Sequence, residues 1–250
     1  MSASYRKDRA LSIAICKAPP NLSREAFENK FTSIVDTLVA LPISQKKYLK
    51  FDLIFQTELG NEQLKALGFP EAPPSVWLTV ECATVADFFE IFEDPAFAQV
   101  VQEGKNDLYG NQPTVNAFLA DVEIRIDRPA SSRTLLVGAM QLTENLSVDE
   151  FHHRLGNSAD KLVSLPIAQR VIVKYSVWRP NNAIDTHLQA MGFSTPESGA
   201  VIMIETEHDT MLEGLMHSET EQYVLDAKRE LNIHIGSSFF VGNVVNKISK

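Results

Sequence analysis

The sequence predicts an α+β fold in which two tandem β-α-β-β-α-β units form one barrel within a single chain. An internal repeat is the first observation: positions 9 to 125 match positions 133 to 247 at an offset of 124, so that Asn21-Leu22-Ser23 recurs as Asn145-Leu146-Ser147. The second observation is that apolar residues follow the spacings of strands and helices in the same order in both copies. The third is the length of 250 residues, which suits two units of roughly 120 residues, each large enough to bury its own core.

The repeat also sets the expected domain boundaries. The offset holds without a gap from Leu11 to about Leu108 and slips by two only near the end, where Phe118-Leu119-Ala120 matches Phe240-Val241-Gly242. We therefore expect a first unit over 1–126, a linker over 127–132 and a second unit over 133–250.

Each unit is expected to open with a strand followed by a helix. In the first unit, residues 11–16 predict a short strand, Ser23 the N-cap of the helix and Pro42 its stop; Ser147 is the equivalent cap in the second unit. Apolar residues at helical spacing predict the face of this helix that packs on the core, namely Phe27, Phe31, Ile34, Val35 and Leu38.

The rest of the unit predicts three more strands and further helical segments. Residues 47–56 alternate, with Phe51 on the side of the helices and Lys50 on the other, as in a half-buried strand. The remaining expected elements are a short helix over 61–67 ending on Gly68, a strand over 76–82, a helical region over 85–107 broken near Pro95, and a last strand over 115–124.

This order is that of the ferredoxin-like split unit. A four-stranded sheet with both helices on one side leaves its other face bare, and two such units cover their bare faces against each other. We therefore expect two tandem ferredoxin-like units that form an intrachain pseudo-dimeric α+β barrel, either as a monomer or as a homodimer of such chains.

The composition is that of an ordinary soluble globular protein and argues against several kinds of partner. Hydrophobic residues are 44% and charged residues 22%, and the net charge of −9 comes without a basic cluster, so no nucleic acid partner is expected. No apolar run reaches the length of a membrane span, and the N-terminal residues lack the apolar stretch of a signal peptide; we expect no membrane partner and a cytoplasmic location. Cys16 and Cys82 are not repeat equivalents, so neither a disulfide nor a zinc site is expected.

Several short motifs carry a resemblance to a known family. They are the Leu-Ser-x-x-x-Phe opening of the first helix, its Leu-Pro stop, and the segments Leu67-Gly68-Phe69-Pro70 and Glu93-Asp94-Pro95-Ala96-Phe97. Over nearly the whole chain, twice, the sequence resembles the EthD-like branch of the dimeric α+β barrel superfamily. The resemblance implies a barrel fold and a superfamily of cofactor-free oxygenases, polyketide cyclases, decarboxylases, haem enzymes and proteins without known activity. The family often carries a His eight residues after the helix-opening Phe; Val35 and Ala159 stand there, which argues against its His-based chemistry in both units.

The sequence holds no Gly-rich phosphate loop, HExxH, CxxC or GxSxG motif, so we expect no metal and no cofactor. Two repeat-equivalent charge pairs remain as candidates: Lys50 with Glu81, and Lys174 with Glu205. Strand alternation places all four on the face that the barrel encloses. They form either an acid/base pair that binds substrate in the lumen or, as the favoured interpretation, structural ion pairs that fix how the units dock.

Loss of side-chain volume predicts a pocket in the second unit. Three core positions shrink between the units: Ile15 becomes Ala139, Ile34 becomes Ser158 and Val35 becomes Ala159. At a fourth position Phe51 becomes Tyr175, so two of the four second-unit residues, Ser158 and Tyr175, carry a hydroxyl. Lost volume either leaves a cavity or is filled by neighbours, here by flexible methionines. We expect the four second-unit residues to bound a cavity for a small ligand, and the four first-unit residues to fill the matching space.

All six histidines lie in the second unit, and two are candidates for acid/base chemistry. His152 flanks the core face of its helix, and His234 precedes the last strand near a pocket mouth; a surface or loop role is the more common one for either residue.

The resulting hypothesis is a cofactor-free enzyme or binder of a hydrophobic, oxygenated small molecule of polyketide-like or aromatic type. Its cyclase-, decarboxylase- or oxygenase-like chemistry would use Tyr175 as hydrogen-bond donor and His152 or His234 as acid/base, with Lys174 and Glu205 binding substrate. Two alternatives stay open: a non-catalytic stress-response or scaffold protein, and a haem-binding protein resembling the chlorite dismutases or the dye-decolourising peroxidases.

Overall fold

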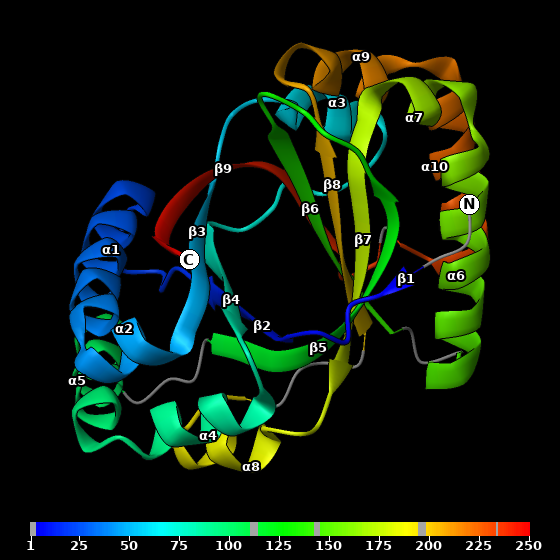
Figure 1. The fold of residues 1–250 in the computed structure, drawn as a ribbon. Helices are drawn as coiled ribbons and strands as arrows, with labels where there is room; N and C mark the ends of the chain where they lie inside the picture. The colour runs from blue at the N-terminus through cyan, green and yellow to red at the C-terminus, as the bar shows by residue number, and fades with distance from the viewer. Residues whose placement is uncertain (1–3, 111–114, 143–145, 195–198, 234) are drawn as a thin grey trace.

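Eight strands close into an antiparallel barrel, and helices cover its outside (Figure 1). The computed structural model describes residues 4–110, 115–142, 146–194, 199–233 and 235–250. Around the barrel the strands follow the order β5-β2-β4-β3-β9-β6-β8-β7, and β7 pairs with β5 to close it. A ninth strand of two residues, β1 (Ser4–Tyr5), pairs with β5 outside this ring.

The first half of the chain, up to Asp127, supplies four of the barrel strands. In the part that the structure describes, its elements after β1 are β2 (Ala10–Lys17), α1 (Arg24–Ala40), α2 (Pro42–Lys47), β3 (Tyr48–Gln56), α3 (Asn61–Ala66), β4 (Ser75–Cys82), α4 (Val85–Glu93), α5 (Pro95–Tyr109) and β5 (Val115–Asp127). Ser23 caps α1, because its side chain accepts a hydrogen bond from the backbone N–H of Ala26 at 3.2 Å. Pro42 follows the end of α1, as expected, but it also begins α2, since proline suits the first turn of a helix.

The second half repeats this order at nearly constant spacing. Its described elements are β6 (Thr134–Gln141), α6 (Val148–Ser164), α7 (Pro166–Val171), β7 (Ile172–Asn181), α8 (Asp185–Ala190), β8 (Gly199–Thr206), η1 (His208–Thr210), α9 (Met211–Met216), α10 (Ser218–Leu231) and β9 (Ser238–Ser249). The starts of α6, β7 and β8 lie 124 positions after those of α1, β3 and β4. The predicted α+β class and element order therefore agree with the structure. No helix in the described part of the chain is long and apolar enough to cross a membrane.

Two seams join the halves, and each seam is a pair of strands. β3 of the first half pairs with β9 of the second, and β5 pairs with β7. Both pairings contain a bulge at the corresponding place, because the register skips Lys247 in β9 and Arg125 in β5. A bulge bends a strand and increases its twist, which helps a sheet to close on itself. The two sheets are thus hydrogen-bonded edge to edge as well as facing each other across the lumen.

Three hydrophobic cores result from this arrangement. Two lie between the sheet and the helices, under α1 and α5 on one side and under α6 and α10 on the other (Figure 1), and the third fills the middle of the lumen. In the lumen, the rings of Trp77 and Phe240 meet edge to face with 5.3 Å between centroids, and Ile13 and Val137 are fully buried. Burying each such side chain stabilises the fold by about 1.5–3 kcal/mol. This apolar layer divides the lumen into two ends, each with its own cavity.

Each half also covers part of the other. α3 lies beside α9, and α8 beside α4 (Figure 1), so that short helices cross from one half to the other. Leu64 of α3 and Phe69 after it belong to the helix-side core of the second half, whereas Leu188 of α8 belongs to that of the first. Lys105 of α5 donates a hydrogen bond to the carbonyl oxygen of Met191 in the second half at 2.9 Å. The two helix-side cores are therefore complete only when both halves are folded together.

Candidate functional site

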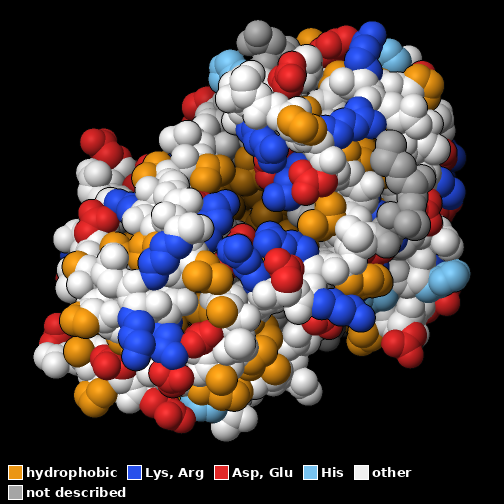
Figure 2. Space-filling model, in the orientation of Figure 1, with side chains coloured by type: hydrophobic (Ala, Val, Ile, Leu, Met, Phe, Trp, Pro, Cys, Tyr) orange, Lys and Arg blue, Asp and Glu red, His pale blue; other side chains and the backbone are white. Residues whose placement is uncertain are grey.

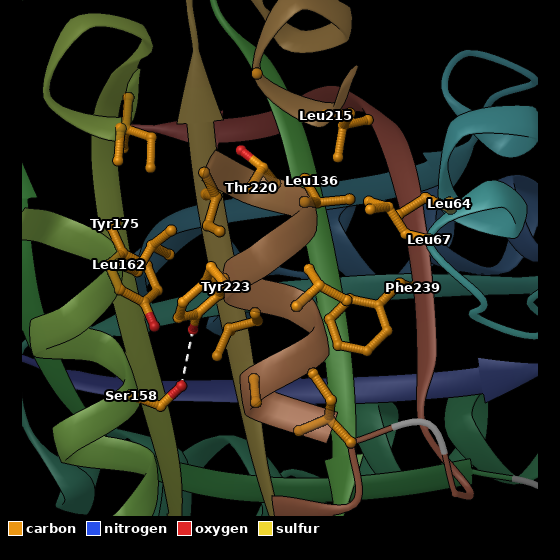
Figure 3. Close-up of a pocket in the computed structure, with 18 of the residues that line it drawn as sticks. Leu64, Leu67, Leu136, Ser158, Leu162, Tyr175, Leu215, Thr220, Tyr223 and Phe239 are labelled. Carbon is orange, nitrogen blue, oxygen red and sulfur yellow. Dashed lines mark hydrogen bonds between the residues drawn. The ribbon is translucent and has the colours of Figure 1, made fainter. Parts of the chain in front are cut away.

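A cavity of about 100 Å³ lies between α6, α10 and the outer face of the second-half strands (Figure 3). Its wall is almost entirely hydrocarbon, from residues that include Leu136, Leu162, Ile204, Leu215 and Phe239. The first half contributes Leu64, Leu67 and Phe69. The cavity is thus a composite of both halves and favours an apolar molecule.

Hydroxyl groups interrupt this apolar wall. Ser158 of α6 and Tyr223 of α10 face each other, with 2.9 Å between the Ser158 Oγ and the phenol oxygen (Figure 3). Tyr175 of β7 and Thr220 of α10 add further hydroxyls, and that of Thr206 donates to a backbone carbonyl. A hydroxyl in hydrocarbon surroundings costs free energy unless it finds a hydrogen-bond partner. These groups are therefore the points at which the cavity can recognise an oxygen atom of a ligand.

Both tyrosines are neutral hydrogen-bond donors at neutral pH. Burial raises the pKa of Tyr223 to about 12, although the hydrogen bond with Ser158 acts in the opposite direction. Burial also raises the pKa of Tyr175 well above its ordinary value near 10, and the neighbouring Tyr223 adds to the effect. Among the described residues that line the cavity there is no carboxylate, ammonium or imidazole. The cavity can therefore hold and polarise an oxygen atom, but it offers no general base.

A corresponding cavity of about 140 Å³ lies in the first half, so the expectation that this space is filled was wrong. Ile34, Val35 and Phe51 line the space rather than fill it. The facing helix α5 carries Gly104 here, and a Cβ on Gly104 would lie only 2.8 Å from Cγ2 of Ile34. The larger side chain of Ile34 on α1 is thus offset by the absence of a side chain at Gly104 on α5. Comparing the two halves one position at a time does not detect this compensation.

The expected wall of the second-half cavity is corrected at two positions. Ala139, like its repeat partner Ile15, faces the lumen and lines a cavity of about 80 Å³ at one end of the barrel. Met140 points to the helix side instead, because successive strand residues alternate between faces. Ala159 is fully buried in the helix-side core but does not line the cavity. Of the four predicted wall residues, Ser158 and Tyr175 are the ones in place.

Among the described residues, no histidine lines this cavity. His152 is half-buried on α6, with its ring edge-on to Phe151 at 5.6 Å between centroids. Burial, and then the positive charge of Arg179, lowers the pKa of His152 below its ordinary value, so this imidazole is neutral at pH 7. Because Tyr175 lines the cavity and His152 does not, the structure does not bring these two predicted residues together. The other candidate, His234, lies outside the described residues. The described residues also hold no group of three or more His, Cys, Asp or Glu suited to a metal ion.

The charged site residues lie in the lumen, on the face that strand alternation predicts. Lys174 and Glu205, together with Lys50 and Glu81, line a cavity of about 300 Å³ at one end of the barrel. Lys174 Nζ lies 3.8 Å from a carboxylate oxygen of Glu205. Figure 2 shows Lys, Arg, Asp and Glu side chains gathered around a hollow between the two helix-covered sides of the molecule. The lumen is thus polar at this end, in contrast to the helix-side cavities.

Comparison with solved structures identifies the fold. A Fusobacterium nucleatum protein described as a "putative monooxygenase" superposes with a TM-score of 0.54 over 98% of this chain and 97% of its own, at 9% sequence identity. An "anthrone oxidase-like protein" superposes with a TM-score of 0.57 over 98% of this chain and 96% of its own, at 8% identity. These proteins are dimeric α+β barrels. The chain has the dimeric α+β barrel fold.

No protein-family model matches the sequence, and a search among curated proteins finds no match. The likeness to dimeric α+β barrel proteins is therefore one of structure, and it assigns no role to any side chain of this chain.

The sequence comparison of the two halves did not predict Tyr223 as a residue of the cavity wall. Lys105 and Lys228 occupy matching places, since each donates to a carbonyl in the turn that the other half contributes, so the offset between α5 and α10 has dropped to 123. At that offset Tyr223 stands where the first half has Val100. The constant offset of 124 matches Tyr223 with Gln99 instead, which hides the gain of a hydroxyl in the wall. Aligning Lys105 with Lys228 gives the offset of 123 and is the sequence signal that could have identified Tyr223.

Proposed function

We propose that this chain is a tandem duplication of a ferredoxin-like unit, nearest to the EthD-like branch by its motifs, and that it works as a monomer. The support is threefold. The starts of the six elements from β2 to β4 recur at an offset of 124. The strand orders β5-β2-β4-β3 and β9-β6-β8-β7 are the same when each half is numbered separately. Each half contributes residues to the helix-side cavity of the other, so a single chain completes both cavities without a second subunit.

The proposed function is the binding and oxidation of a hydrophobic, oxygenated aromatic molecule in the second-half cavity. The observation that carries it is the Ser158–Tyr223 hydroxyl pair, at 2.9 Å, in a wall that is otherwise hydrocarbon. The repeat equivalents in the first half are Ile34 and Val100, which carry no hydroxyl, and of the two Ile34 lines the first-half cavity. An aromatic ketone or phenol suits the chemistry of this wall, because its rings contact hydrocarbon while its oxygen accepts from or donates to the hydroxyls. At about 100 Å³ the cavity is smaller than the roughly 300–1,000 Å³ of small-molecule sites, so binding of a multi-ring ligand requires α6 and α10 to move apart.

We further propose that the chemistry is oxygenase-like and uses no bound cofactor. An anthrone, a tricyclic aromatic ketone, loses an acidic C–H proton to give an anion that O₂ oxidises; one anthrone and one O₂ give one anthraquinone and one water. Neutral phenols that donate to the ketone oxygen stabilise the charge that develops there, and Tyr175 and Tyr223 supply such groups. The proton leaves to solvent, since the described wall residues include no base. The solved structures described as monooxygenase and anthrone oxidase-like add support by analogy of fold.

Anthrone binding and turnover test the proposal. Calorimetric titration measures binding, and anthraquinone absorbance together with O₂ consumption measures oxidation. Val224→Phe, in the wall of the second-half cavity, should abolish both, whereas Val101→Phe, at the corresponding position of the first-half cavity, is the matched control and should leave them intact. Overpacking costs roughly 1–3 kcal/mol at either place, so the difference between the variants reports the site rather than the fold.

The outcomes separate the alternatives. Loss of binding with Val101→Phe but not with Val224→Phe would move the site to the first half. Binding without oxidation would leave a binding protein. Absence of both would favour the non-catalytic scaffold role, and a Soret band during titration with haem would favour the haem-binding alternative.

A further inference from the structure

The end of the lumen that carries Lys174 is a separate cavity with a chemistry of its own. It measures about 300 Å³, which is within the range of small-molecule sites. Its apolar lining comes from residues that include Leu11, Ile54, Val122, Leu135 and Met203. The indole of Trp178 forms part of the wall and is held in place by the hydrogen bond from its Nε1 to Ser176 Oγ at 3.0 Å. Much of the cavity wall is therefore apolar, and one part of it is aromatic.

Charged side chains at this cavity form two similar clusters, one in each half, and each cluster pairs a glutamate with arginine. Glu81 is contacted by Arg9 at 3.3 Å and by Arg6 at 3.6 Å, and Glu205 is contacted by Arg133 at 2.6 Å. Arg9 and Arg133 are repeat equivalents, as are the two glutamates. Both carboxylates are thus already neutralised by arginine.

The two lysines of the cavity differ in what holds them. Lys50 lies 2.6 Å from Asp52, a buried aspartate two residues along the same strand. Ser176 replaces that aspartate in the second half, so Lys174 has lost the equivalent partner. Among the described residues, the one acid within 4.0 Å of Lys174 is Glu205, at 3.8 Å, and Arg133 already engages Glu205 more closely. Lys174 is therefore a weakly paired ammonium group in a partly enclosed cavity.

We propose that this end of the lumen binds a small aromatic carboxylate, with the carboxylate on Lys174 and the ring against Trp178. A weakly paired ammonium gains a charge-assisted hydrogen bond when a carboxylate arrives. A singly charged carboxylate suits one such group, whereas a phosphate dianion would require more unpaired donors. The site is distinct from the helix-side cavity of the proposed function, which shares no wall residue with it.

Benzoate and its neutral isostere benzamide are the probes. The chain has two tryptophans, and Trp77 lines the cavity at the other end of the lumen, so Trp77→Phe leaves Trp178 as the sole fluorescent reporter. Benzoate should quench this fluorescence saturably, and benzamide should bind at least about tenfold more weakly, as expected for loss of a charged hydrogen-bond partner. Lys174→Gln should cost a similar factor, while Lys50→Gln, the matched control whose lysine is held by Asp52, should cost less than about threefold.

Ser176→Asp tests the asymmetry directly. It gives Lys174 the partner that Asp52 gives Lys50, so benzoate affinity should fall by about tenfold or more. Circular dichroism checks the fold of this variant, because Asp52 also accepts a hydrogen bond from Asn246, whereas Ser176 pairs with Ile124. Equal binding of benzoate and benzamide, or an unchanged affinity in Lys174→Gln, would overturn the proposal. The Lys174→Gln and Lys50→Gln pair decides the question even if Ser176→Asp does not fold. Val224→Phe should leave benzoate binding unchanged, so failure of this site and failure of the anthrone site are distinguishable.

Discussion

A carboxylate oxygen of Glu123 lies 2.6 Å from a guanidinium nitrogen of Arg179, across the seam between β5 and β7. The Glu123 side chain is 4% exposed, and its other oxygen contacts Arg125 at 2.6 Å. The opposite seam, between β9 and β3, places Val245 and Phe55 at the corresponding positions. One seam is therefore closed by buried charges, and the other by apolar side chains.

Glu123→Val should destabilise the protein by about 3–5 kcal/mol, because it leaves two largely buried guanidinium groups without their shared carboxylate. The double variant Glu123→Val with Arg179→Phe copies the apolar seam and should recover most of that loss. Urea unfolding of the wild type, both single variants and the double variant gives the coupling energy. Additive losses in the double variant would show that the two residues are not energetically coupled.

Tyr223→Phe should remove about 1 kcal/mol at neutral pH, since the Ser158 hydroxyl loses its partner at 2.9 Å. The substitution should also change how the free energy of unfolding depends on pH at alkaline pH. The folded-state pKa of about 12 lies above the ordinary value near 10, so this phenol contributes stability that is complete below pH 10 and is lost as pH rises through about 12. The variant should decline less steeply between these pH values in urea unfolding, whereas Tyr5→Phe, at an exposed tyrosine, should match the wild type.

Lys105→Met should destabilise the protein by about 1–3 kcal/mol, because the ammonium donates to the carbonyl of Met191 at 2.9 Å and lies 5.9 Å from the centre of the Phe193 ring. Lys228→Met, at the equivalent place, should cost a similar amount. Lys30→Met is the control, since its partner Asp107 is exposed and such pairs are worth about 0–1 kcal/mol. Chemical denaturation compares the three. Equal, small effects would mean that the cross-half lysines do not help to hold the halves together.

Much of the architecture could be predicted from the repeat together with strand alternation. An offset of 124 carries the elements from β2 to β4 onto those from β6 to β8. A polar residue between apolar ones, such as Lys174 between Val173 and Tyr175, indicates which face of a strand it occupies. The lumen position of Lys174 and Glu205 follows from this pattern. The seams could not be predicted in the same way, because backbone hydrogen bonds between β5 and β7 leave no periodic signal in either strand.

The cavities were harder to predict, for two physical reasons. The strand around Ile15 is apolar on both faces, so its sequence does not show which side chains reach the lumen. Ile15 and Ala139 face the lumen and not, as expected from the sequence, the helices. Cavity volume also depends on both walls. Ile34 does not fill the first-half space, because Gly104 on the facing helix leaves room for it.

His152 should make the stability of the protein fall on the acid side of pH 6.5. Burial and Arg179 lower the folded-state pKa of His152, whereas the unfolded chain binds the proton near 6.5. The contribution of this residue is therefore complete above pH 6.5 and is lost as pH falls through the folded-state pKa. His152→Gln should flatten the decline in unfolding free energy from pH 7 to pH 5, and His153→Gln, at the exposed neighbour, should leave it unchanged. An NMR titration in which the His152 imidazole protonates at or above pH 6.5 would contradict the lowering of its pKa by burial.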